Sequence, residues 1–255
     1  MSKNIQGEVH FMTTSGVAIS TYFCDVTPEI RLNVFKKSIN SLIVSEYKGP
    51  IFLVDDGSTK KDHLNFVREV YGDRIFIQER SENGGLSKVK NTGIRLLMEN
   101  KCDIGFLVDD DMEYLPNWFT AYEEAISKTG IPHFSFYWNK GEYLYENTTY
   151  NDYGIIKTAL LSGCFLTITG QLINDIGYFR ILPTKVGHEH TNFTLRAIHH
   201  KKIPYFCDIA DSEKYLMLIP ESGTRTSVGG VRDPREDEIG ALIARDLDVI
   251  HPCIE

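Results

Sequence analysis

Residues 103–116 read DIGFLVDDDMEYLP, an apolar run that ends in three consecutive aspartates. Residues 104–108 have the length and composition of a buried strand. Asp109, Asp110 and Asp111 follow without a Lys or Arg beside them, although adjacent carboxylates repel one another. Mg²⁺ and Mn²⁺ prefer oxygen ligands, and Mg²⁺ typically takes one or two protein carboxylates together with substrate phosphates. We therefore expect Asp109 and Asp111 to hold Mn²⁺ or Mg²⁺ that carries a diphosphate. The simpler alternatives are an acidic turn exposed to solvent or a cluster of residues that caps a helix N-terminus.

Short apolar runs alternate with helical patterns through the first half of the chain. This alternation predicts an α/β fold with a mostly parallel central sheet and helices on both faces. Ligands of such sheets bind beyond the carboxyl ends of the strands. The predicted strands cover residues 16–23, 50–55, 74–79 and 103–110, and the predicted helices cover residues 28–43, 60–71, 84–100 and 115–130.

The second half is less regular, and its predicted elements are short. We expect one domain over residues 1–255, with a nucleotide-binding half (14–112), an acceptor-binding half (113–210) and a C-terminal loop and helix (211–255). The predicted strands are 133–139, 159–170 and 203–209, and the predicted helices are 171–179, stopped by Gly177, and 238–250. Residues 187–202 are predicted as a polar loop that enters a helix, and residues 221–237 as a glycine-rich loop.

Composition excludes several classes of protein. A formal net charge of -8 argues against nucleic-acid binding. Five scattered cysteines argue against a disulfide framework or a structural zinc site, and favour a reducing compartment. The N-terminus lacks the apolar region of a secretory signal, and no apolar stretch reaches the roughly 18 residues of a membrane span. We expect a soluble, cytoplasmic protein; contact with a membrane surface and the oligomeric state stay open.

Polar motifs follow two other predicted strands. In VDDGST (54–59), Asp55 and Asp56 can accept a hydrogen bond from a heterocyclic N–H group, and an Asx turn is the alternative. NGGLSKVKN (83–91) places glycines and Lys90 at a helix start, where anions bind favourably; a plain loop with surface lysines is the alternative.

GHEHTNFTLR (187–196) offers Glu189 and His190 at another helix start. Either side chain can act as a general base or as a further metal ligand, and a polar helix cap is the alternative. His199 and His200, farther along the same predicted helix, are interpreted as surface residues.

Taken in order, these motifs resemble those of family 2 glycosyltransferases with the GT-A fold, which has a Rossmann-like central sheet. The matching segments are AISTYF, VDDGST, GGLSKVKNTGI, LVDDDM, LSGCFLTITGQLINDIGYF and GHEHTNFTLR, and together they span roughly residues 16–208. The resemblance implies a metal-dependent enzyme that moves a sugar from a nucleoside diphosphate donor, as in polysaccharide biosynthesis.

The resemblance also implies roles for individual residues. Ser20 and Tyr22 match positions that line the nucleotide, and Asp56, with Asp55 beside it, matches the carboxylate that reads the uracil N–H group. Lys90 stands where the family usually has arginine. Asp109 and Asp111 match the D-x-D motif, in which Asp109 also borders the nucleotide. Some relatives carry a late histidine ligand; none lies near residues 208–212, so a third protein ligand stays unassigned.

Glu189-His190 occupies the place of the family's common Glu-Asp pair, whose second acid is the catalytic base. The resemblance alone does not choose between them. We favour Glu189 from the sequence, because a carboxylate can also stabilise the positive charge that develops on the sugar.

We therefore expect an inverting glycosyltransferase that moves a sugar from a UDP-sugar to the hydroxyl of a saccharide, lipid-linked or other acceptor. The loop TRTSVGG (224–230) is expected to close over the donor. A nucleotidyltransferase is one alternative, although the glycine-rich loop that it needs after the first strand is replaced by YFCDVTPE. A non-catalytic sugar-binding relative is the other.

Overall fold

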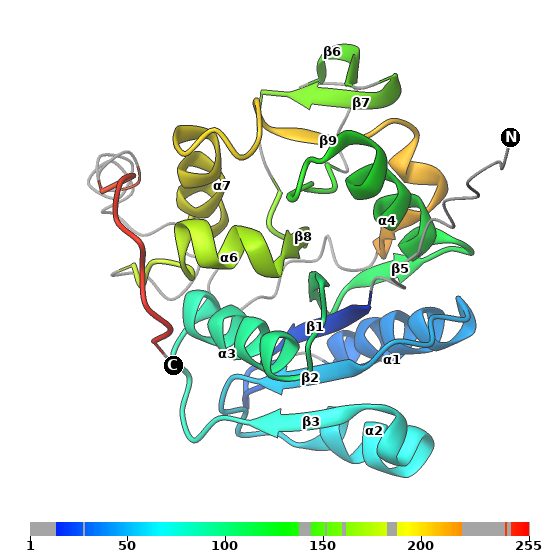
Figure 1. Cartoon of the computed structure of the whole chain (residues 1–255). Coiled ribbons are helices and arrows are strands. Elements are labelled where there is room, and N and C mark those ends of the chain that lie inside the picture. The colour runs from blue at the N-terminus through cyan, green and yellow to red at the C-terminus, as the bar shows by residue number, and fades with distance from the viewer. Residues whose placement is uncertain are drawn as a thin grey trace, which may run out of the picture.

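A five-stranded sheet forms the centre of the computed structural model, which describes residues 14–27, 29–137, 144–150, 152–159, 162–182, 188–220, 243 and 246–254. The strand order is β3-β2-β1-β4-β8 (Figure 1). The first four of these strands are parallel, and β8 runs antiparallel to β4. The predicted mostly parallel sheet is confirmed. The strands are β1 (Ser15–Thr21), β2 (Ile51–Asp55), β3 (Phe76–Glu79), β4 (Ile104–Asp109) and β8 (Phe165–Thr169).

The register of the sheet brings the polar ends of three strands to one edge. Thr21 lies opposite Asp55, and Ser20 lies opposite Asp109. Strands β1, β2 and β4 are buried almost throughout, which explains their continuous apolar sequences. The carboxyl ends of the strands therefore carry the polar residues that the interior of the sheet excludes.

Helices cover both faces of the sheet, as predicted. On one face, Trp118 of α4 packs 4.8 Å from the ring of Phe106 and donates a 2.9 Å hydrogen bond to Ser45, just after α1. On the other face, Gly93 of α3 lies so close to β1 that an added Cβ would sit 2.9 Å from Ala18. Figure 1 shows α3 against β1 and β2. The helices are α1 (Glu29–Val44), α2 (Asp62–Tyr71), α3 (Leu86–Glu99), α4 (Trp118–Thr129), α6 (Gly170–Ile176) and α7 (Glu189–His199), with short 3-10 turns η1 (Gly72–Arg74) and η2 (Ser212–Lys214).

Two smaller sheets flank the central one. Strand β5 (Met112–Tyr114) follows the three aspartates directly and pairs with β10 (Leu216–Leu218), and the N–H of Ile219 donates to the carbonyl of Asp111 at 3.0 Å. The acidic turn therefore lies between two paired strands, β4 of the central sheet and β5, which pairs with β10. The other sheet, drawn at the top of Figure 1, consists of β6 (Leu144–Tyr150), β7 (Tyr153–Thr158) and β9 (Cys207–Ile209).

Several predicted elements of the second half differ from the structure. The described part of the predicted strand 133–139 forms only an isolated bridge, Ser135 with Leu166. The predicted strand 159–170 shortens to β8, and the strand 203–209 to β9. Residues 246–250 are not helical, although Ile243 is. The loop 221–237, with its TRTSVGG segment, lies outside the described residues. The stop at Gly177 is confirmed, since this glycine has a φ of 75° and its N–H donates to Ile173.

None of the helices in the described ranges is long and apolar enough to cross a membrane.

Candidate functional site

The acidic turn after β4 gives each of its three aspartates a different environment. Asp109 lies at the strand end, where its Oδ1 accepts a 3.0 Å hydrogen bond from Nζ of Lys90. The Lys90 side chain is fully buried, and its ammonium also donates to the carbonyl of Gly163 at 2.9 Å. Lys90 therefore joins α3 to the ends of both β4 and the segment that leads into β8. The burial of Lys90 contradicts the surface location, and its role at an anion site stays a prediction.

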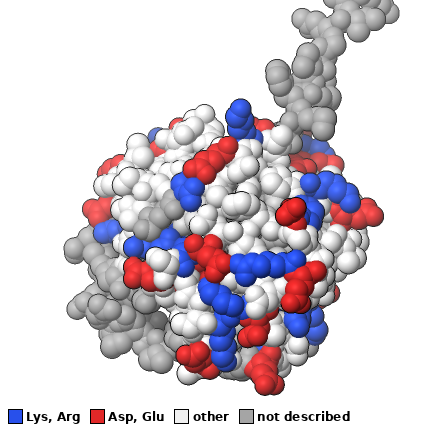
Figure 2. Space-filling model, turned by 90° about the horizontal axis from the view of Figure 1, so that it is seen from below, with Lys and Arg blue, Asp and Glu red and all other residues white. Residues whose placement is uncertain are grey.

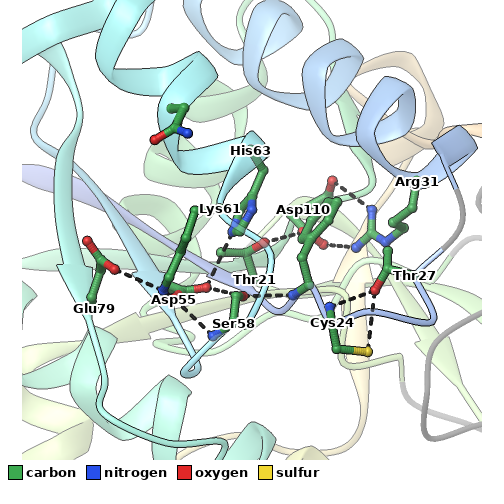
Figure 3. Close-up of polar contacts among 12 residues, drawn as sticks. Thr21, Cys24, Thr27, Arg31, Asp55, Ser58, Lys61, His63, Glu79 and Asp110 are labelled. Atoms are coloured by element: carbon green, nitrogen blue, oxygen red, sulfur yellow. Dashed lines mark hydrogen bonds and ion pairs between the residues drawn. The ribbon is translucent and has the colours of Figure 1, made fainter.

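Asp110 points into the protein. Its Oδ2 accepts a 2.6 Å hydrogen bond from the hydroxyl of Thr21, and its Oδ1 pairs with the guanidinium of Arg31 from α1 (Figure 3). Arg31 is flanked by Phe23, whose ring centroid lies 5.6 Å from the guanidinium carbon. The middle carboxylate is thus neutralised internally and anchors the turn to β1 and α1.

Asp111 lacks a comparable ion pair among the described residues. Its Oδ1 is buried and has no hydrogen-bond partner there. Burial, together with the charges of Asp109 and Asp110, raises the pKa of Asp111 to about 7. The hydroxyl of Tyr114 is also buried without a partner, and burial and the nearby Asp109 and Asp111 raise its pKa well above the ordinary value.

These residues fit a divalent cation with oxygen ligands. An unpartnered carboxylate oxygen beside a second carboxylate is the donor set that Mg²⁺ or Mn²⁺ uses, with the remaining ligands supplied by water or phosphate. Among the described residues, no three His, Cys, Asp or Glu side chains group to hold a metal. Asp109 and Asp111 would therefore be the protein ligands from the described part of the chain.

Asp55, the last residue of β2, is buried and binds residues of the turn that follows the strand. It is 0% exposed, and its carboxylate accepts from the N–H and hydroxyl of Ser58, from Lys61 Nζ at 2.9 Å and binds His63 Nε2 at 3.3 Å (Figure 3). Burial raises the pKa of Asp55, but the hydrogen bonds from His63, Ser58 and Lys61 outweigh it and lower the pKa. This is the Asx-type turn weighed against nucleotide contact, so Asp55 does not face a ligand.

Asp56 is differently placed. Its Oδ1 accepts from Arg80 Nε and from the N–H of Gly84, both at 3.0 Å, and its Oδ2 accepts from the N–H of Gly85 at 2.8 Å. A carboxylate offers about four lone-pair sites. One site on Oδ2 is thus left within the described structure, at the junction of β2 and the loop before α3.

Ser20 and Tyr22 lie at the same edge of the sheet. Ser20 is opposite both Val54 and Asp109, and Tyr22, just past the end of β1, is partly exposed. The register therefore groups Ser20, Tyr22, Asp56 and Asp109 at the carboxyl ends of three adjacent strands, as the sequence predicts for a nucleotide site.

Glu189 and His190 open α7. The side chain of Glu189 is 2% exposed and that of His190 is 18% exposed. Glu189 Oε1 lies 3.0 Å from His190 Nδ1, and Glu189 Oε2 is buried without a hydrogen-bond partner among the residues that the structure describes. Burial raises the pKa of Glu189, but the charge and hydrogen bond of His190, with Lys90, outweigh burial and lower it to about 2. Glu189 is therefore an anion at neutral pH.

Gly163 connects this pair to the acidic turn. An added Cβ at Gly163 would lie 2.6 Å from His190 Nδ1, so only glycine allows the imidazole to pack there. The carbonyl of the same glycine accepts from Lys90, which also binds Asp109. His199 and His200 contact the C-terminal segment instead, through Asp248 and the carbonyl of Leu247.

Sequence reasoning missed Arg31, Thr21, Arg80 and Gly163. Arg80 stands directly after a predicted strand, as Asp56 does, and this position is a usable signal. Arg31 lies 79 residues from its partner Asp110, and the sequence around it is that of an ordinary helix. No local pattern therefore identifies Arg31 as part of the site.

Comparison with known proteins adds an independent line of argument. The model of the family described as glycosyl transferase family 2 matches residues 17–191. A protein of Acanthamoeba polyphaga mimivirus named uncharacterized glycosyltransferase R363 is 38% identical over 222 residues, which cover 85% of this chain and 84% of that protein.

Solved structures share the fold. A crystal structure of S. aureus TarS 1-349 superposes with a TM-score of 0.58 at 18% identity, covering 80% of this chain and 60% of that one. The mannosyltransferase PcManGT from Pyrobaculum calidifontis, in complex with GDP-Man and Mn²⁺, gives a TM-score of 0.52 at 14% identity over 71% of this chain and 52% of that one. This chain thus spans less than two thirds of either structure.

The contact between Arg31 and Asp110 predicts a large loss of stability in Arg31→Met. Removing one member of a buried ion pair strands the other charge, which we expect to cost about 3 kcal/mol of unfolding free energy. Arg31→Lys keeps the charge and should lose less. Urea unfolding measures both.

The matched control is Arg68→Met. Arg68 also pairs with a carboxylate, that of Glu79, but its side chain is 47% exposed. Such surface pairs contribute less than about 1 kcal/mol. Equal losses in Arg31→Met and Arg68→Met would contradict an anchoring role for Arg31.

Proposed function

This chain belongs to glycosyl transferase family 2, and we propose that it transfers a sugar, with inversion, from a UDP-sugar to the hydroxyl group of a saccharide, lipid-linked or other acceptor. Its membership makes it a glycosyltransferase with a nucleotide-sugar donor. It also favours glycosyl transfer over the nucleotidyltransferase and the non-catalytic relative considered from the sequence. The identity of the nucleotide, the metal and the stereochemistry form the proposal.

The observation that carries the proposal is the unpartnered Oδ1 of Asp111 beside Asp109. Two carboxylates at the carboxyl edge of a parallel sheet suit a Mn²⁺ or Mg²⁺ ion bound to a diphosphate. Two fold neighbours support this chemistry. The structure of GalNAc-T7 contains UDP, GalNAc and Mn²⁺, and that of PcManGT contains GDP-Man and Mn²⁺.

The bound metal supplies positive charge that stabilises the diphosphate as it leaves the sugar. The chain's own residues prepare for that step. Lys90 and the Arg31–Asp110 pair fix the turn that presents Asp109 and Asp111. Ser20 and Tyr22 line the nucleotide at the end of β1. These positions orient the donor before the acceptor attacks.

Asp56 would read the base. Its remaining lone pair on Oδ2 accepts the N3–H group of uracil, which cytosine lacks. Arg80 and the N–H groups of Gly84 and Gly85 hold the carboxylate in place. A TarS structure in complex with UDP and another with UDP-GlcNAc support a uridine donor for this fold.

The acceptor hydroxyl must lose a proton as it attacks the anomeric carbon. The Glu189–His190 pair at the start of α7 is placed for this purpose, because Lys90 and Gly163 join it to the acidic turn. A positioned base typically contributes about 10²–10⁴-fold to the rate.

Metal dependence is tested by thermal unfolding. UDP should raise the melting temperature more with Mn²⁺ than with EDTA, because a ligand that binds only the folded state stabilises it. Asp111→Ala should remove the metal-dependent part of the shift, whereas Asp73→Ala, a change at an exposed aspartate of η1, should keep it. The same UDP shift in Mn²⁺ and in EDTA would rule out this metal site.

Uracil recognition is tested by titration calorimetry in the presence of Mn²⁺. Pairing N3–H with a buried acceptor should favour UDP over CDP by about 1–3 kcal/mol, roughly 5- to 150-fold in affinity. Asp56→Asn should abolish this preference. Arg80 and Gly84 favour the amide oxygen at the position of Oδ1, so the NH₂ group takes the position of Oδ2, where it can accept neither the uracil N–H nor the hydrogen bond from Gly85.

Asp55→Asn is the neighbouring control for the same titration. It disturbs an internal hydrogen-bond network and should lower stability without changing the ratio of UDP to CDP affinity. An unchanged ratio in Asp56→Asn would remove Asp56 from the base-binding site.

A further inference from the structure

Glu189 and His190 are neighbours, but they differ in access to a substrate. Glu189 Oε1 contacts the imidazole, Oε2 is buried with no hydrogen-bond partner among the described residues, and the whole side chain is only 2% exposed. The His190 side chain keeps 18% of its surface exposed. Of the two side chains, His190 is therefore the more accessible to an acceptor hydroxyl.

The hydrogen bond between them determines where the imidazole carries its proton. An ionised carboxylate can only accept hydrogen bonds, so Nδ1 of His190 must be the donor in the 3.0 Å contact with Glu189 Oε1. In the neutral imidazole, Nε2 then carries the lone pair. No hydrogen bond engages Nε2 within the described part of the chain.

Residues of several elements pack around the Glu189–His190 pair. On the α3 side, Lys90 lies near Glu189 and binds both Asp109 and the carbonyl of Gly163. Gly163 itself packs against the imidazole ring. On the far side, His133 is buried between the carbonyl of Thr167 and the hydroxyl of Thr194 of α7, and burial lowers its pKa to about 4. Among the described residues, the charged groups close to the pair are therefore Lys90 and Asp109, and His133 stays neutral.

We propose that His190 is the catalytic base and that Glu189 is a positioning residue that fixes the imidazole tautomer and stabilises the imidazolium. This inference rests on the proposed sugar transfer. Nε2 takes the proton of the acceptor O–H group while that oxygen forms a bond to the anomeric carbon. The bond from the anomeric carbon to the diphosphate oxygen breaks, UDP leaves with the electron pair, and the imidazolium then releases its proton to water.

The proposal reverses the preference for Glu189 that the sequence alone favours. A carboxylate next to a developing cation is chemically attractive, but it must reach the sugar. Glu189 faces the imidazole and the interior, and the exposed edge of the pair belongs to His190. A buried acid behind an imidazole is the arrangement that orients a histidine base in other enzymes.

The test uses water as the acceptor, so the natural acceptor need not be known. UDP release is measured with Mn²⁺ for UDP-glucose, UDP-galactose and UDP-N-acetylglucosamine, and the donor with the fastest turnover is used thereafter. His190→Asn should lower kcat by about 10²-fold or more, while the affinity for UDP stays unchanged. His199→Asn, on an exposed histidine of the same helix, should keep wild-type turnover.

Two further variants separate proton transfer from packing. His190→Asp restores a group that can accept a proton, and should recover at least tenfold of the lost rate with the acid limb of the pH profile moved to lower pH, because carboxyl groups titrate below imidazoles. Glu189→Gln keeps an oxygen for the Nδ1–H bond but removes the anion, so kcat should fall and the acid limb should also move to lower pH. A residue that only packs would not shift that limb.

Long-range ¹⁵N–¹H spectra of the wild-type protein give a readout independent of turnover and of folding in the variants. The His190 signals should show a protonated Nδ1 and an unprotonated Nε2 at pH values where the imidazole is neutral. The opposite tautomer would overturn the proposal. So would near-normal kcat in His190→Asn with a large loss in Glu189→Gln, or normal kcat in both.

Failure of the proposed function has a different signature. If the wild-type protein binds no UDP and releases none from any of the three donors, the uridine donor is wrong. If UDP binds and is released but His190→Asn has no effect, only the assignment of the base is wrong.

Discussion

Three adjacent carboxylates at the end of β4 are the constraint on which the rest of the site depends. The mutual repulsion of these carboxylates has to be offset, and each has a different environment. Asp109 binds Lys90, Asp110 binds Arg31 and Thr21, and Oδ1 of Asp111 has no hydrogen-bond partner within the described part of the chain. Thr21 and Arg31 bind the side chain of the middle aspartate, Asp110. The two outer aspartates are the proposed ligands of a cation.

The partners of the acidic turn explain why distant segments meet there. Lys90 comes from α3, Arg31 from α1, and Gly163 precedes β8. Through Gly163 the same network sets the distance to the imidazole at the start of α7. The proposed donor site and the proposed base are therefore positioned by one connected set of polar contacts, although they lie in separate halves of the chain.

The sequence predicts the part of this arrangement that depends on local pattern. Apolar runs with polar ends, such as residues 104–111, identify the strands of the parallel sheet and the edge where their ends meet. The prediction fails where pairing is long-range. Residues 133–137 have the composition of a strand, but they form only the isolated bridge of Ser135 with Leu166. The β5–β10 pair joins segments about 100 residues apart. Asp55 and Asp56 show the same limit within the site. The two aspartates are adjacent and identical in sequence, so only their partners in the folded chain, such as Lys61 for Asp55 and Arg80 for Asp56, show that their environments differ.

The central claim is that Asp110 is compensated inside the protein whereas Asp111 waits for a cation. Melting temperatures of Asp110→Asn and Asp111→Asn, measured in EDTA at pH 8, test it most directly. The account predicts changes of opposite sign. Asp110→Asn should melt lower, because Arg31 loses its counter-charge, and Asp111→Asn should melt higher, because a buried, repelled carboxylate is removed. A lower melting temperature for Asp111→Asn, or a higher one for Asp110→Asn, would contradict the account.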